Sequence, residues 1–134
     1  MRAEFSFEVD PARDLVRIRM AGFFRQADIG AFLEARRIAH RQLTCPPNAH
    51  LTINDIRGMD IQSQDIVDAF QAMLADPEYR SRRLAFVVGY TLARAQAIRA
   101  LESRSARWFT DPAEAEAWLL ADDAGEAPLR RAAG

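Results

Sequence analysis

The sequence contains no lysine, a single cysteine and almost no net charge. All 18 basic residues are arginines, which excludes catalysis through a lysine Schiff base and a phosphate-binding loop that depends on lysine. The formal net charge is −1, so no overall field favours nucleic acid or an anionic membrane. Cys45 has no partner for an intrachain disulfide, which favours a reducing compartment.

Long apolar segments are also lacking. No unbroken apolar run is longer than that at residues 84–88, which is too short to span a bilayer, and the first residues lack the apolar core of a signal peptide. We therefore expect a cytoplasmic protein. With 134 residues, of which 49% are hydrophobic and 28% charged, the chain has the size and composition of one globular domain.

Strand patterns occur at five places along the chain. Residues 5–9 and 16–20 alternate apolar and polar side chains, and the turn-forming segment between them is short, which predicts an antiparallel hairpin. Further strands are predicted at residues 51–54, 84–88 and 106–109. The run at 84–88 is apolar at every position, which is typical of a strand covered on both faces.

Helical patterns separate these strands. Ser63, Thr91 and Asp111 have the character of N-caps, and Ala115, Trp118 and Leu119 are expected to form the buried stripe of the last helix. The first predicted helix covers about residues 27–43, the second runs from Ser63 to Asp76-Pro77, the third from Thr91 through Glu102, and the fourth begins at Asp111-Pro112. The alternation predicts an α/β fold: a mixed, mostly parallel five-stranded sheet packed with four main helices. We expect a single domain at 1–121 and a disordered tail at 122–134.

One polar segment follows the strand at 51–54. In open α/β sheets ligands bind beyond the carboxyl ends of strands, so the candidate partner-binding surface is Asp55, Arg57, Gly58, Asp60 and Ser63. In one interpretation the segment binds an anion at the N-terminus of the helix that follows Ser63, and Arg57 assists the binding. The other is structural: the carboxylates bond loop amides, Arg57 pairs with one of them, Gly58 permits a turn and Ser63 caps the helix.

A catalytic or metal centre is not indicated. Asp55 and Asp60 have no nucleophile or orienting histidine near them in the sequence, so we expect no enzyme activity. His40 and His50 lack metal-ligand spacing, and His40 near a helix C-terminus is explained by complementing the helix dipole. We expect neither a metal nor a cofactor.

Three segments together resemble a known fold. They are the strand end Met20-Ala21-Gly22, the stretch at 50–59 and the ending Trp108-Phe109 with Trp118-Leu119. Over residues 4–120 the chain resembles STAS domains, and more narrowly the bacterial branch similar to the sporulation anti-sigma-factor antagonist, called SpoIIAA-like. The resemblance implies a non-catalytic protein-interaction or regulatory module whose partner is another protein.

The resemblance also implies a phosphorylation site and an alternative function. Signalling members carry a phosphorylated serine at the start of the second helix; the matching segment is 59–63, where the Asp-Ser-(Ser/Thr)-Gly motif is absent and Ser63 is the only hydroxyl. The branch is also similar to lipid-carrying CRAL-TRIO folds, which implies a carrier or sensor of a small apolar or lipid-like ligand between helices and sheet. The aromatic residues themselves leave two interpretations open. In one, Trp108, Phe109 and Trp118 belong to the core between the last strand and the last helix; in the other, they line an apolar pocket together with Phe23, Phe24 and Phe70. A homodimer formed through helices is also expected.

Overall fold

The structure is a computed structural model that describes residues 1–100 and 106–121. The elements follow in the order β1 (Glu4–Asp10), β2 (Leu15–Gly22), α1 (Gln26–His40), β3 (Leu51–Met59), α2 (Gln64–Ala75), the 3₁₀ helix η1 (Pro77–Tyr79), β4 (Arg83–Val87), α3 (Leu92–Ala100), β5 (Arg107–Phe109) and α4 (Pro112–Leu119). The tail expected from residue 122, and the end of the third predicted helix, lie outside the described residues.

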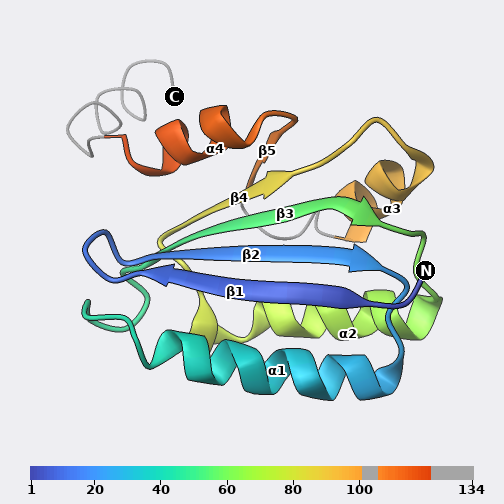
Figure 1. The fold of residues 1–134 in the computed structure, drawn as a ribbon, viewed down its shortest axis with the longest axis horizontal. Helices are drawn as coiled ribbons and strands as arrows, with labels where there is room; N and C mark the ends of the chain where they lie inside the picture. The colour runs from blue at the N-terminus through green and yellow to red at the C-terminus, as the bar shows by residue number, and fades with distance from the viewer. Residues whose placement is uncertain (101–105, 122–134) are drawn as a thin grey trace.

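The strands form one mixed sheet whose spatial order is the chain order, β1-β2-β3-β4-β5. β1 pairs with β2 antiparallel, and every other neighbouring pair is parallel (Figure 1). The predicted hairpin, the mostly parallel sheet and the four α-helices are thus confirmed. The short β1–β2 connection allows only antiparallel pairing, whereas each parallel pair is joined through a helix.

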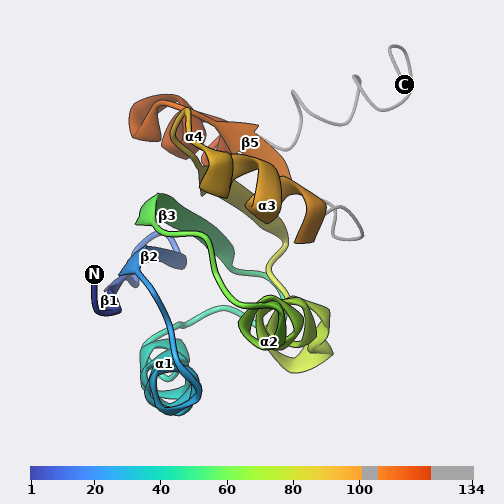
Figure 2. The same cartoon turned by 90° about the vertical axis from the view of Figure 1, so that its right-hand side faces the viewer.

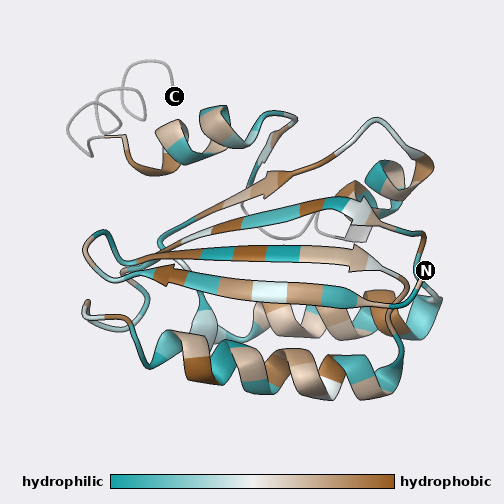
Figure 3. Ribbon diagram, in the orientation of Figure 1, coloured by the Kyte–Doolittle hydropathy of each residue, from teal (hydrophilic) through white to brown (hydrophobic). Residues whose placement is uncertain are grey.

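Helices cover both faces of this sheet. α1 and α2 pack on one face, and α4 packs on the other (Figures 1 and 2). β4 lies between the two layers and is buried along its whole length, as the apolar run at residues 84–88 predicts. β1 and β2 instead alternate hydrophobic and hydrophilic residues, which Figure 3 shows along both strands. Their apolar side faces α1, and their polar side is therefore available at the surface.

β3 is longer than predicted. The sequence interpretation ends the strand near Asn54, but pairing with β2 continues to Met59 across an irregularity at which Asp55 pairs with Arg19 and Gly58 with Ala21. A Cβ atom at Gly58 would lie only 2.9 Å from the Cβ of Ala21. Gly58 therefore permits a close approach of two strands, and its predicted role in a turn is wrong.

The last helix begins as predicted. The Asp111 carboxylate accepts a hydrogen bond from the Ala113 amide at 3.0 Å, and Pro112 occupies the first helical position. Ala115 and Leu119 are fully buried against the sheet, in agreement with the predicted stripe. Trp118 is only partly buried. Its ring lies beside that of Phe109, at the edge of the apolar cluster that Ala115 and Leu119 form with residues of the sheet.

Candidate functional site

The five predicted surface residues lie in two places. Asp55, Arg57 and Gly58 belong to β3, while Asp60 and Ser63 lie in the connection between β3 and α2. The loop position predicted for the first three is therefore wrong, because continued pairing with β2 keeps the segment in the sheet.

Asp55 and Arg57 lie on the α4 side of the sheet, in the part that α4 leaves uncovered. We call this part the open face. It is formed by β1, β2 and β3, and its polar residues are Glu4, Ser6, Glu8, Arg17, Arg19, Asp55 and Arg57.

Asp55 and Arg57 bind each other tightly. The Arg57 guanidinium donates from Nε to Oδ1 at 3.0 Å and from its terminal nitrogen to Oδ2 at 2.7 Å, and the Arg57 amide also donates to Oδ1 at 3.1 Å. Partial burial opposes ionisation of Asp55, but the hydrogen bonds from Arg57 outweigh it and hold the pKa of Asp55 below its usual value. The carboxylate is therefore a fixed anion suited to contact and unsuited to proton transfer.

Asp60 and Ser63 make contacts that differ from those predicted. Asp60 lies 3.6 Å from the amino group of Met1, which places the N-terminus beside this connection. Ser63 precedes α2 in extended conformation, but its side chain makes no capping hydrogen bond. The hydroxyl instead donates to Oδ1 of Asp65. The predicted side-chain cap is therefore wrong, although Ser63 is exposed and chemically accessible.

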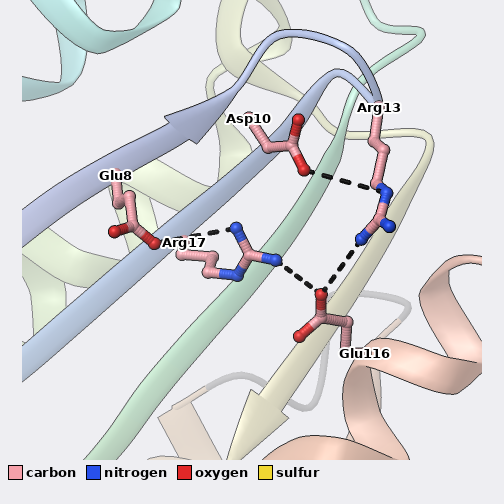
Figure 4. Close-up of polar contacts among 5 residues, drawn as sticks. All are labelled: Glu8, Asp10, Arg13, Arg17 and Glu116. Carbon is pink, nitrogen blue, oxygen red and sulfur yellow. Dashed lines mark hydrogen bonds and ion pairs between the residues drawn. The ribbon is translucent and has the colours of Figure 1, made fainter.

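Ion pairs join the open face to α4 at the hairpin end. Arg17 lies between Glu8, at 3.6 Å, and Glu116 of α4, at 2.5 Å (Figure 4). Arg13 approaches the same Glu116 at 3.7 Å and Asp10 at 3.8 Å. These pairs neutralise one another's charge, so this end of the face is occupied by internal contacts. Within the part of the chain that the structure describes, Arg19 makes no such ion pair.

A second candidate site is a cavity between the sheet and the helices. It has a volume of about 140 Å³ and is lined by residues of β2, β3 and β4 and of α1, α2 and α3. Large apolar side chains in its wall include Ile18, Phe32, Phe70, Met73, Leu74 and Phe86. Of the aromatic residues predicted to line a pocket, only Phe70 does so; the two tryptophans, Phe23, Phe24 and Phe109 are not part of the wall.

Polar groups interrupt the apolar wall at a few points. Asn54 projects from β3 between Ile18 and Phe86, its register partners on β2 and β4. Its Oδ1 is buried and accepts no hydrogen bond from any described residue. Thr52 and Ser81 satisfy each other through a 2.7 Å hydrogen bond. The period-two alternation of β3 places Asn54 on the helix-covered face, so the sequence itself contains a signal for its inward position.

Arg36, His40 and Tyr79 line one end of the cavity. The Arg36 guanidinium lies 4.0 Å from the centre of the Tyr79 ring and 3.7 Å from Asp76. The His40 ring packs edge-on against Tyr79 and against His50, at centroid distances of 4.9 and 4.6 Å. Burial, together with His50 and Arg36, lowers the pKa of His40 to about 4. His40 is thus neutral near pH 7, and its predicted role as a cation at the helix C-terminus is wrong.

We expect the histidines to make stability fall in mild acid. The unfolded chain protonates His40 near pH 6.5, whereas the folded chain does so only at about 4, so stability present above pH 6.5 is lost as the pH falls through that window. Since solvent partly screens the ring, the expected loss is about 1–2 kcal/mol. His40→Phe keeps the ring contacts and removes this titration. Urea denaturation at pH 7 and pH 4.5 should show a smaller loss for the variant, and equal losses would contradict the assignment.

Among residues 1–100 and 106–121, no group of three or more histidine, cysteine, aspartate or glutamate side chains is arranged to hold a metal ion. In the same residues, no helix has the length and apolar character needed to cross a lipid bilayer.

Comparison with known proteins gives a match in structure. No protein-family model matches the chain, and no curated protein matches its sequence. A solved structure of an uncharacterised protein of the DUF3478 family from Shewanella loihica PV-4, described as having a SpoIIAA-like fold, superposes with a TM-score of 0.67 at 14% sequence identity. The alignment covers 87% of this chain and 94% of that one. The chain therefore has the SpoIIAA-like α/β fold of STAS domains, as the sequence resemblance predicts.

Proposed function

We propose that the chain is a non-catalytic regulatory module that binds another protein through Asp55, Arg57, Gly58, Asp60 and Ser63. The observation that carries this proposal is the uncovered, charged face of the sheet around Asp55 and Arg57. A sheet face that packs on nothing is usually polar, but here the charges are also held in place by the Arg57–Asp55 hydrogen bonds. Fixed charges of both signs favour a specific polar interface over a simple anion site.

The SpoIIAA-like fold supports the same function, because the resemblance implies partner binding without catalysis. The connection that carries Asp60 and Ser63 follows directly from the end of β3, so the two groups of candidate residues belong to one continuous segment. Asp60, Ser63 and Arg57 are all exposed. We propose that a partner spans this segment from the open face to the start of α2, in the cytoplasm.

The test is capture of a partner by paired variants. We expect the double variant Arg57→Ala/Asp60→Ala to lose at least about tenfold in affinity for a partner identified with the wild type and then purified, because truncating charged interface groups costs about 1.4 kcal/mol or more. Glu34→Ala/Arg37→Ala is the matched control, since it also removes one charge of each sign, from an exposed pair on α1. It should bind normally.

Equal binding by the Arg57/Asp60 variant and the wild type would place the working surface elsewhere. Loss of binding in the α1 control alone would move it to the basic end of α1. Both variants must first show the wild-type melting temperature, so that a folding defect is not read as lost contact. Light scattering of the same samples at micromolar concentration tests the predicted homodimer, and a strictly monomeric mass would contradict it.

A second candidate function is favoured by the cavity. A space of about 140 Å³ with an apolar wall is suited to a small apolar ligand, which makes the chain a carrier or sensor. Native mass spectrometry of freshly purified protein tests this function directly. A bound small molecule that survives transfer to the gas phase supports it, and a bare chain that also fails to bind added apolar compounds contradicts it.

A further inference from the structure

We infer that the cavity takes a small, uncharged, apolar molecule that carries a hydroxyl group, such as a phenol or a short alcohol. This inference rests on the second candidate function and specifies its ligand. Three features of the wall lead to it: the size of the cavity, the unsatisfied amide of Asn54 and the balance of charge around Arg36.

The size of the cavity limits the ligand to one ring or a short chain. Its volume, about 140 Å³, is close to that of the engineered apolar cavity, roughly 150 Å³, in which benzene binds. Phe32, Phe70 and Phe86 supply aromatic surface from α1, α2 and β4, while Met20, Met59 and Met73 supply flexible side chains that adapt to a bound shape. The exposed Asp60 and Thr91 also belong to the lining, so the cavity is open to solvent at the connections after β3 and β4.

Asn54 provides the polar anchor. Its side chain ends in a donor, Nδ2, and an acceptor, Oδ1, and the buried Oδ1 accepts no hydrogen bond from any described residue. A buried polar group without a partner is costly, and the side chain stands between Ile18 and Phe86, which offer none. Rotation about its second side-chain torsion turns either amide atom toward the cavity. A hydroxyl group matches this anchor, because it both donates and accepts.

The charges at the buried part of the cavity disfavour an ionised ligand. Three arginines belong to its lining: Arg36, Arg80 and Arg94. Arg80 is exposed to water and the Arg94 guanidinium lies 5.3 Å from the centre of the Tyr90 ring, whereas the Arg36 side chain is only 12% exposed and already lies 3.7 Å from Asp76. Its terminal nitrogen also donates to the Met73 carbonyl at 3.3 Å, and Tyr79 covers its face. A carboxylate in the cavity would compete with Asp76 and lose its hydration, whereas an uncharged hydroxyl avoids both costs. The buried Nε of Arg36, which has no partner among described residues, is a second donor for such an oxygen.

Three probes of one shape separate these contributions. Toluene, p-cresol and 4-methylbenzoate share a methylated ring and differ in carrying no polar group, a hydroxyl or a carboxylate. The readout is the ¹³C-methyl NMR signal of the methionines, because Met20, Met59 and Met73 line the cavity while Met1 lies outside it and is 71% exposed. We expect p-cresol to shift the three cavity signals and leave Met1 unchanged, with a lower Kd than toluene, and 4-methylbenzoate to bind weakest.

Asn54→Leu tests the anchor. The substitution keeps the approximate size of the side chain and removes both hydrogen-bonding atoms, so the Kd of p-cresol should rise roughly threefold to tenfold and that of toluene should stay the same or fall. Toluene should then bind the variant more tightly than p-cresol, because burying a hydroxyl group without a hydrogen-bonding partner costs free energy. Gln42→Leu, which removes an exposed amide outside the cavity, is the matched control and should keep the wild-type order.

The possible results distinguish failure of the inference from failure of the function. If no probe shifts Met20, Met59 or Met73, the cavity does not bind apolar molecules and the second candidate function fails. If toluene binds the wild type as tightly as p-cresol, or 4-methylbenzoate binds best, ligand binding stands and the hydroxyl assignment is overturned. If Asn54→Leu does not fold, the order of the Kd values of the three probes for the wild type still tests the hydroxyl assignment.

Discussion

Phe24→Ala is expected to lower the free energy of unfolding by about 3–5 kcal/mol. The Phe24 side chain is fully buried beside β2 and α1, and its ring lies 6.4 Å from Phe5 and 5.5 Å from Phe70. Truncation leaves a void that these rings fill only in part, so the protein loses both burial and ring contacts. A loss of this size is severe in a domain whose total stability is typically about 5–15 kcal/mol.

The neighbouring residue supplies the control. Phe23 has the same side chain one position earlier but is 36% exposed, so Phe23→Ala should cost less than about 1 kcal/mol. The hydrogen bond from the Phe24 amide to Gln62 should survive in both variants, because the backbone keeps its donor. Urea denaturation gives the two values. Similar losses in the two variants would show that the packing around Phe24 is not as described.

Arg83→Leu is expected to destabilise the protein by about 2–4 kcal/mol and to loosen α4. One terminal nitrogen of this buried arginine donates to the carbonyls of Trp118, Leu119 and Ala121 at 3.0, 3.0 and 3.1 Å. These oxygens belong to the last turn of α4 and the residues after it, where intrahelical donors run out, although the Trp118 carbonyl also accepts from the Ala121 amide at 3.3 Å. Leucine removes the arginine donor from the buried Leu119 carbonyl and from the two partly buried carbonyls, and a buried acceptor that loses its donor costs about 1–3 kcal/mol.

Arg107→Leu is the matched control for this variant. Arg107 also lies over the Trp118 ring, with its guanidinium carbon 5.5 Å from the ring centre, but it is exposed. Its replacement should cost about 0.5–1 kcal/mol, the usual value of an exposed cation–π contact. Denaturation followed by tryptophan fluorescence and by circular dichroism measures both effects. If the two variants lose the same stability, the ring contact accounts for the result and the carbonyl contacts do not.

The local elements were largely determined by the sequence itself. The apolar run at β4 predicted a strand buried on both faces, and the structure confirms it. The alternation in β1 and β2, with a short turn between them, predicted the hairpin. Asp111 and Pro112 predicted the start of α4. Each of these signals is local, because periodicity, turn residues and caps act within a few positions of one another.

The end of β3 was decided by tertiary contacts. Residues 55–59 are polar and contain a glycine, which favours a loop when they are considered alone. The neighbouring β2 supplies pairing partners through Gly22, and Gly58 lets the two strands approach, so the segment remains a strand and carries Asp55 and Arg57 onto the open face. A strand's hydrogen bonds come from another part of the chain, and local sequence reports them poorly.

The cavity and the titration of His40 also arise only in three dimensions. Asn54 is placed on the helix-covered face by alternation, but its lack of a hydrogen-bonding partner depends on Ile18 and Phe86, which come from other strands. The pKa of His40 is low because burial disfavours its charged form, and His50, from a distant segment, and Arg36 add to this effect. Sequence by itself determined which residues face inward; only the packing of separate elements decided which inward polar groups are satisfied, which are charged and where space remains between them.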